Sequence, residues 1–122
     1  MIRATLLTLA LVLWSSLAIS QENVTSAQGA TLRGLDRVTG ALVDITLAAG
    51  EMQQFGRLQV TLGECRYPTA DPSSNAYAYL SIFDAGSQQA QVFQGWMIAA
   101  SPALNALDHP RYDIWVLRCN MA

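Results

Sequence analysis

The sequence predicts an all-β protein: a small single-domain β-sandwich or barrel of six to seven short antiparallel strands, with one short helical segment and one disulfide. Apolar and polar residues alternate with a period of two in several short segments, as they do in strands that bury one face. Turn-forming residues separate these segments at the spacing of roughly 8–12 residues that is typical of sandwiches and barrels. Two cysteines follow what reads as an export signal.

The first twenty residues are expected to form a cleaved signal peptide. A cationic start at residues 1–3 precedes an apolar run over residues 4–17, and the small residues Ala18 and Ser20 predict a cut before Gln21. An uncleaved membrane anchor is the alternative, but the apolar run is short against the roughly 20 residues that span a bilayer. The signal predicts export to the periplasm.

The mature chain, residues 21–122, has the length of one domain. Residues 21–30 are polar and aperiodic and are expected to form a flexible leader, so residues 31–122 are expected to form a single β domain. Six of the seven cationic residues, all arginine, and all nine acidic residues fall in the mature chain, whose formal charge is therefore −3. This balance provides no basic footprint for nucleic acid or for an anionic membrane surface.

Five segments are the clearest strands. In the first two, branched apolar residues alternate with polar ones, while the last three are apolar on both faces. Glycine-containing turns separate the first segments, and residues 67–75, with two prolines and two serines, form a loop. The predicted strands cover residues 42–47, 58–63, 76–84, 91–99 and 112–119.

Residues 101–107 predict one or two helical turns. Ser101 can cap a helix, and Pro102 suits the first helical position. Leu104 and Leu107 would share one helical face.

Cys65 and Cys119 are expected to form the disulfide, because an even cysteine count in an oxidising compartment favours a bridge. A redox pair or a metal site is the alternative. Neither cysteine lies in a Cys-x-x-Cys spacing, and a single histidine cannot complete a common zinc set. No metal site and no cofactor is predicted.

His109, the only histidine, stands among Asp108, Arg111, Tyr112 and Asp113. A catalytic role would need a nucleophile or an orienting acid placed beside it, and no nucleophile motif occurs. The structural interpretation is that the following proline stops the helical segment and starts the last strand. No catalytic residue is therefore predicted.

Four motifs resemble a family of small exported alphaproteobacterial proteins, the domain of unknown function 2155. They are RGLDRVTG at 33–40, FGRLQVTLGEC at 55–65, GWMIAASPAL at 95–104 and HPRYDIWVLRC at 109–119. The resemblance extends over roughly residues 33–119. It implies an exported single-domain protein with this cysteine pair, and it implies no activity and no catalytic residue.

The strands of the second half are apolar on both faces, although a small two-layer domain normally buries one face per sheet. Exposed aromatic patches usually mark binding surfaces. The sequence therefore predicts a non-enzymatic periplasmic binding module for a protein or cell-envelope partner, with no nucleic-acid partner and no membrane span after cleavage. The candidate surface comprises Tyr77, Tyr79, Phe83, Phe93 and Trp115.

Three alternatives remain open. The leader, the 101–107 segment or loops would cover the second face, leaving the aromatic residues in the core. The protein would inhibit a secreted enzyme, with loop 67–75 entering the partner's cleft. Or it would be a small hydrolase or redox accessory that uses His109 or the cysteines.

Overall fold

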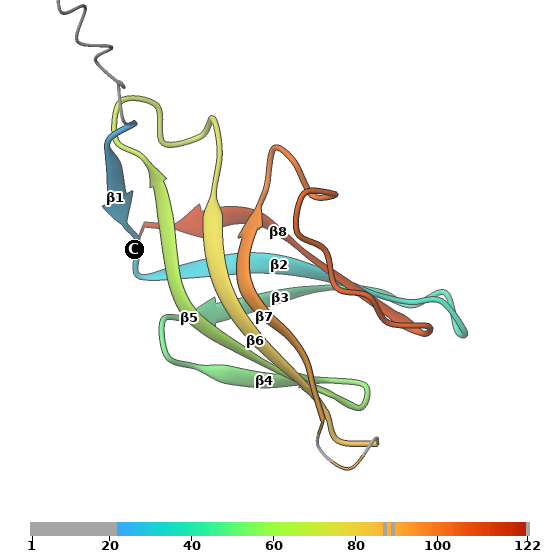
Figure 1. Ribbon diagram of the computed structural model, residues 1–122. Coiled ribbons are helices and arrows are strands. Elements are labelled where there is room, and N and C mark those ends of the chain that lie inside the picture. The colour runs from blue at the N-terminus through green and yellow to red at the C-terminus, as the bar shows by residue number, and fades with distance from the viewer. Residues whose placement is uncertain (1–21, 87, 89, 122) are drawn as a thin grey trace, which may run out of the picture.

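The computed structural model describes residues 22–86, 88 and 90–121, which fold into antiparallel strands arranged in two packed sheets (Figure 1). The all-β prediction is confirmed, and the layered arrangement is that of a sandwich, but the described residues form eight strands where six to seven were predicted. The expected signal peptide, residues 1–20, and its cleavage site lie outside the described residues.

The larger sheet has five strands in the order β1-β5-β6-β7, with β4 paired to the other end of β5. The smaller sheet has three strands in the order β3-β2-β8. The strand bounds in the larger sheet are β1 Val24–Ser26, β4 Met52–Phe55, β5 Leu58–Pro68, β6 Tyr77–Asp84 and β7 Ala90–Ile98. Those in the smaller sheet are β2 Gly29–Asp36, β3 Leu42–Ala48 and β8 Tyr112–Asn120.

The chain passes twice from one sheet to the other along one side of the sandwich. Between β1 and β2, the Ala27 N–H donates to the Cys65 carbonyl of the larger sheet, whereas the Gln28 N–H donates to the Asn120 carbonyl of the smaller one. The turn between β3 and β4 makes the second crossing (Figure 1). On the opposite side, β7 and β8 are the edge strands, and residues 99–111 connect them.

The core lies between the two sheets and is filled by every second residue of the strands. On β6, for example, inward residues are buried and outward residues are half-buried along the whole strand. The period-two pattern thus places aliphatic side chains in the core, where their burial stabilises the fold. The largest fully buried aliphatic residues are Leu32, Ile45, Leu47, Leu58, Leu62, Leu80, Ile82 and Ile114.

Two predictions about local structure were wrong. Residues 101–107 form turns, not a helix, because Leu107 points into the core at 5% exposure while Leu104 is 73% exposed, so these leucines share no face. The expected flexible leader contains β1, and β2 already begins at Gly29. Strand β1 is short and mostly polar, so its sequence has no clear hydrophobic alternation. It is a strand because it pairs with β5.

Candidate functional site

His109 is the centre of a buried polar junction at one end of the sandwich. Its ring is 6% exposed, and its Nε2 lies 2.8 Å from Oδ2 of Asp84, at the end of β6. Its Nδ1 accepts hydrogen bonds from the backbone N–H groups of Arg111 at 3.0 Å and Tyr112 at 3.1 Å. Because Nδ1 accepts two bonds, Nε2 must carry the ring proton and donate it to Asp84.

The partners of His109 are themselves fixed. The Asp84 carboxylate also accepts the Gly86 N–H at 2.8 Å, and its hydrogen bond from His109 lowers the pKa of Asp84. The Tyr112 ring lies 5.2 Å from the His109 ring, and its hydroxyl accepts the Arg57 N–H at 3.3 Å. A Cβ at Gly56 would stand 2.5 Å from that hydroxyl, so the close approach of the tyrosine requires glycine.

An ion pair extends the junction to β2. Arg111 holds Asp36 with two hydrogen bonds, of 3.1 and 2.9 Å, a bidentate geometry that is among the stronger charge-assisted contacts. The bond from Arg111, together with the backbone N–H groups of Val38 and Thr39, lowers the pKa of Asp36 to about 2. Arg37 donates to the His109 carbonyl at 2.7 Å. Asp36, the last residue of β2, thus pairs with the residue just before β8.

Both ring nitrogens of His109 are engaged in these bonds. Of the cysteines, Cys65 and Cys119 form the predicted disulfide, with 5.8 Å between their Cα atoms. The bridge ties β5 of the larger sheet to β8 of the smaller one. Neither thiol is therefore free in this structure.

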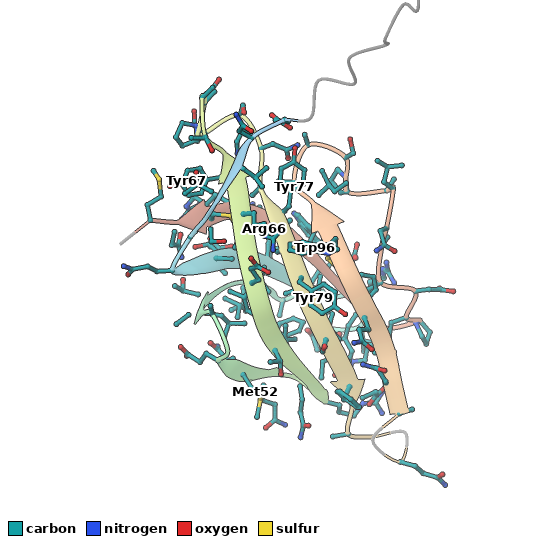
Figure 2. The ribbon with its side chains drawn as sticks, turned by 60° about the vertical axis from the view of Figure 1, so that its left-hand side comes forward. Met52, Arg66, Tyr67, Tyr77, Tyr79 and Trp96 are labelled. Atoms are coloured by element: carbon teal, nitrogen blue, oxygen red, sulfur yellow. A yellow bond between two sulfur atoms is a disulfide. The ribbon has the colours of Figure 1, made fainter. Side chains whose placement is uncertain are left out.

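The aromatic cluster lies on the outer face of the larger sheet (Figure 2). Tyr77 and Tyr79 of β6, Trp96 of β7 and Arg66 of β5 gather there, as Figure 2 shows. The Tyr79 and Trp96 rings meet edge to face at 5.4 Å, and the Arg66 guanidinium lies 5.2 Å from the Trp96 ring centre. We call these four residues the aromatic face.

On the aromatic face, both tyrosine hydroxyls and the Arg66 guanidinium have partners. The Tyr77 hydroxyl donates to Glu22 at 2.8 Å, which raises the pKa of Tyr77. Gln94 donates to the Tyr79 hydroxyl at 2.9 Å, and Arg66 pairs with Glu64. A shallow groove of about 270 Å³ runs between Glu22, Val24, Arg66, Tyr77, Trp96 and Ile98.

The structure separates the five residues of the predicted surface. Tyr77, Tyr79 and Phe83 lie half-buried on the outer side of β6, as expected. Phe93 is a core residue, 9% exposed, because it is paired with the inward-facing Ile82. Trp115 lies on β8, in the other sheet, and so does not adjoin the tyrosines.

Of the six residues that line the groove, the predicted surface included only Tyr77. Phe93 and Met97 of β7 face the core, and Trp96 lies on the opposite, outward face of the same strand. Arg66 follows the buried Cys65, so the alternation places it outside. Glu22 had no detectable signal, because its position depends on the pairing of β1 with β5.

A depression of about 650 Å³ lies at the disulfide end, between residues 72–75, 99–100 and the end of β8. The polar side chains of its loop wall are bonded within the chain, and Arg118 of β8 also lines it. Ser73 and Ser74 bond to Asp71, and the side-chain Oδ1 of Asn75 accepts the Ala76 and Ala100 N–H groups. These bonds hold the loop in place.

Within the described ranges, histidine, cysteine and acidic residues nowhere form a group of three that could hold a metal ion. In the same part of the chain, no helix is long and apolar enough to cross a membrane.

Comparison with known proteins gives one family and a similar relative. A family model described as an uncharacterized protein conserved in bacteria, domain of unknown function 2155, matches residues 30–119. The uncharacterized protein RP359 of Rickettsia prowazekii (strain Madrid E) is 31% identical over 88 residues, which cover 70% of this chain and 56% of RP359. The matched part is thus little more than half of that relative's length. No solved structure matches significantly.

Proposed function

The chain belongs to the domain of unknown function 2155 family, and we propose that it is a non-enzymatic periplasmic module that binds a protein or cell-envelope partner. The partner would dock on the aromatic face. The single observation that carries the proposal is the gathering of two tyrosines, a tryptophan and an arginine on the side of the larger sheet that the core does not use.

The composition of the aromatic face favours binding. Tyrosine, tryptophan and arginine are the residue types that dominate the energetics of protein interfaces. They combine a large apolar area with a polar group that can bond to a partner or to water.

The packing of the aromatic face supports the same proposal. Edge-to-face contact between Tyr79 and Trp96, together with the Arg66 stack, restricts the rotamers of all three side chains before any partner arrives. Glu22 and Gln94 fix the two tyrosine hydroxyls. A surface whose side chains are already ordered gives more affinity per contact than a mobile one.

A non-enzymatic role is also consistent with the junction at His109. The histidine bonds to Asp84 and to two backbone N–H groups, which makes it a structural hub. The disulfide engages both thiols. We therefore propose binding, not catalysis, as the activity of this domain.

Site-specific photo-crosslinking in the native host tests the proposal. A photoreactive phenylalanine analogue replaces Tyr79 in the exported chain, and in a matched strain it replaces Leu42, an exposed apolar residue of the other sheet. We expect a discrete crosslinked product in the periplasmic or envelope fraction from position 79 only. Digestion with protease distinguishes a protein partner from a lipid or glycan.

The substitution Tyr79→Ala should reduce capture of the same partner at least tenfold, as for an interface hot spot of about 2 kcal/mol. Because this side chain points outward, the free energy of unfolding should change by less than about 1 kcal/mol. Leu42→Ala should leave capture unchanged. A loss of several kcal/mol in stability, typical of core truncation, would instead make the aromatic face a structural feature.

A further inference from the structure

Strand β8 has an open edge. It pairs with β2 on one side, and no strand of the described chain lies on its other side. That edge faces the opening of the sandwich crossed by residues 99–111, between β7 and β8 (Figure 1). Edge strands present unpaired N–H and C=O groups to any extended chain that approaches them.

The register shows which backbone groups are unpaired. The Arg37 N–H donates to the Arg111 carbonyl, and the Asp36 N–H donates to the Ala41 carbonyl. In an antiparallel ladder the bonding direction alternates along the strand, so odd-numbered residues from Arg111 to Trp115 bond to β2. The N–H and C=O groups of Ile114 and Val116 consequently point to the open edge. Among the described residues, none of the hydrogen bonds outside the strand ladders engages those groups.

A groove of about 390 Å³ runs beside this edge. One wall consists of Pro102, Ala103 and Ala106, and the other of residues 113–115 on β8. The first wall is held to β7, because the Asn105 side chain donates to the Trp96 carbonyl at 2.9 Å. The groove therefore exists before any ligand binds.

The position of the wall decides between two occupants. A single extended segment would lie about 4.8 Å from β8 and would need no more room than one strand. A second copy of this chain pairing through its own β8 would bring β2 and β3 behind it, into the 102–106 wall. The groove thus favours a peptide over a homodimer.

The outward side chains of β8 indicate the composition of the peptide. Asp113 is the one charged residue among those lining the groove. Its carboxylate lies 3.6 Å from the Arg37 guanidinium and remains one-third exposed, and Trp115 lies next on the same face. Residues opposite one another on neighbouring strands stabilise the pairing when their charges are opposite, or when an aromatic meets a cation or an apolar side chain. Apolar residues at the alternate positions would face the alanine and proline wall.

From these observations we propose that the open edge of β8 is a strand-addition site for an extended peptide segment that alternates basic and apolar residues. Main-chain hydrogen bonds to Ile114 and Val116 would provide affinity, and Asp113 and Trp115 would provide selectivity, as in other cases of β-augmentation. This site is separate from the aromatic face and does not depend on it.

The test uses a synthetic peptide as long as β8, 9 residues, alternating valine and lysine and blocked at both ends. It is titrated into the 15N-labelled exported protein. We expect saturable binding, with the largest shift changes and the greatest slowing of amide exchange at Ile114 and Val116. Two N-methylated peptides, one methylated at all valines and one at all lysines, provide a backbone test. Only the peptide whose methyl groups face β8 should lose binding.

Ala106→Phe should fill the groove and weaken binding at least tenfold, since Ala106 is exposed and its enlargement leaves the core intact. Ala85→Phe, at an equally exposed turn far from the groove, is the matched control and should bind normally. Tyr79→Ala should also bind normally. The absence of saturable binding, equal binding by both methylated peptides, or normal binding by Ala106→Phe would overturn the proposal. Shift changes centred on Tyr79 and Trp96 would overturn it too, while supporting the aromatic face.

Discussion

The two sheets are joined at two opposite ends by different chemistry. At one end the Cys65–Cys119 disulfide links β5 to β8. At the other, His109 and Asp84 link the start of β8 to the end of β6, and Arg111 adds the bond to Asp36 of β2. The covalent link acts mainly by restricting the unfolded chain and does not depend on pH. The polar link acts in the folded state and depends on which groups are ionised.

This difference indicates how a small domain holds a modest core together. A sandwich of this size buries a limited apolar area, so additional links between its layers carry a larger share of the stability. Neither link offers a free reactive group, and both leave the outer faces of the sheets unoccupied. Stabilisation and recognition therefore use different residues.

The largest effect should come from the covalent end. Cys119→Ser should lower the free energy of unfolding by about 2–4 kcal/mol, which corresponds to a fall in melting temperature of about 4–8 °C for each kcal/mol in a domain of this size. Differential scanning calorimetry measures it. Reductant should destabilise the native chain in the same way and leave the variant unaffected. Alkylation of both cysteines in the folded, unreduced protein would contradict the bridge.

The second largest loss of stability should come from the polar end, at His109. His109→Ala leaves the Asp84 carboxylate and two backbone N–H groups without their partner, and a buried unsatisfied group costs about 1–3 kcal/mol. Urea unfolding measures the loss. Pro110→Ala is the matched control and should cost less than about 1 kcal/mol, because it changes only the freedom of the unfolded chain. If the proline variant is the less stable of the two, the backbone turn holds this end, not the hydrogen bonds.

The smallest expected effect is a pH dependence of stability, which should arise from the polar end and not from the disulfide. The pKa of Asp36 falls from 3.8 to about 2 on folding because of Arg111. Because the pKa is lower in the folded protein, the ionised carboxylate stabilises the fold at any pH above the pKa of the unfolded chain. This stabilisation is lost as the pH falls from about 4 to 2. We expect the melting temperature of the native chain to fall across this range.

Asp36→Asn should flatten that decline, and Cys119→Ser should retain it in full. Asp108→Asn, at an exposed position next to His109, is the control and should follow the native chain. Identical slopes for the native chain and Asp36→Asn would show that the ion pair does not contribute to acid sensitivity.

Local patterns in the sequence were sufficient for much of the fold. Alternation placed Leu80 and Ile82 inside and Tyr79 outside, and cysteine parity predicted the disulfide. These features depend on neighbours within one strand or on a count, so no tertiary information is needed. The start of the last strand just after Pro110 was also expected, whereas the helical segment that this proline was predicted to stop does not form at residues 101–107.

Long-range pairing could not be derived in the same way. Nothing local to β8 indicates that it joins β2 and not β6, so Trp115 was assigned to the wrong sheet. The importance of His109 depends on Asp84, which lies 25 residues earlier in the chain. Strand β7 has apolar residues on both faces, so its alternation does not indicate which face is buried. The outward position of Trp96 could therefore not be predicted from β7 alone.

The pairing of β2 with β8 also has a consequence for how the chain folds. The central strand of the smaller sheet finds one of its two neighbours more than 75 residues later, so a large loop must close before that sheet is complete. Domains dominated by such distant contacts fold slowly, on the scale of milliseconds to seconds. Until β8 has been synthesised, one edge of β2 and the core residues Ala30 and Leu32 remain uncovered. Partly made chains would therefore be prone to association through β2, and a holding chaperone that covers this strand would favour a high yield of the native protein.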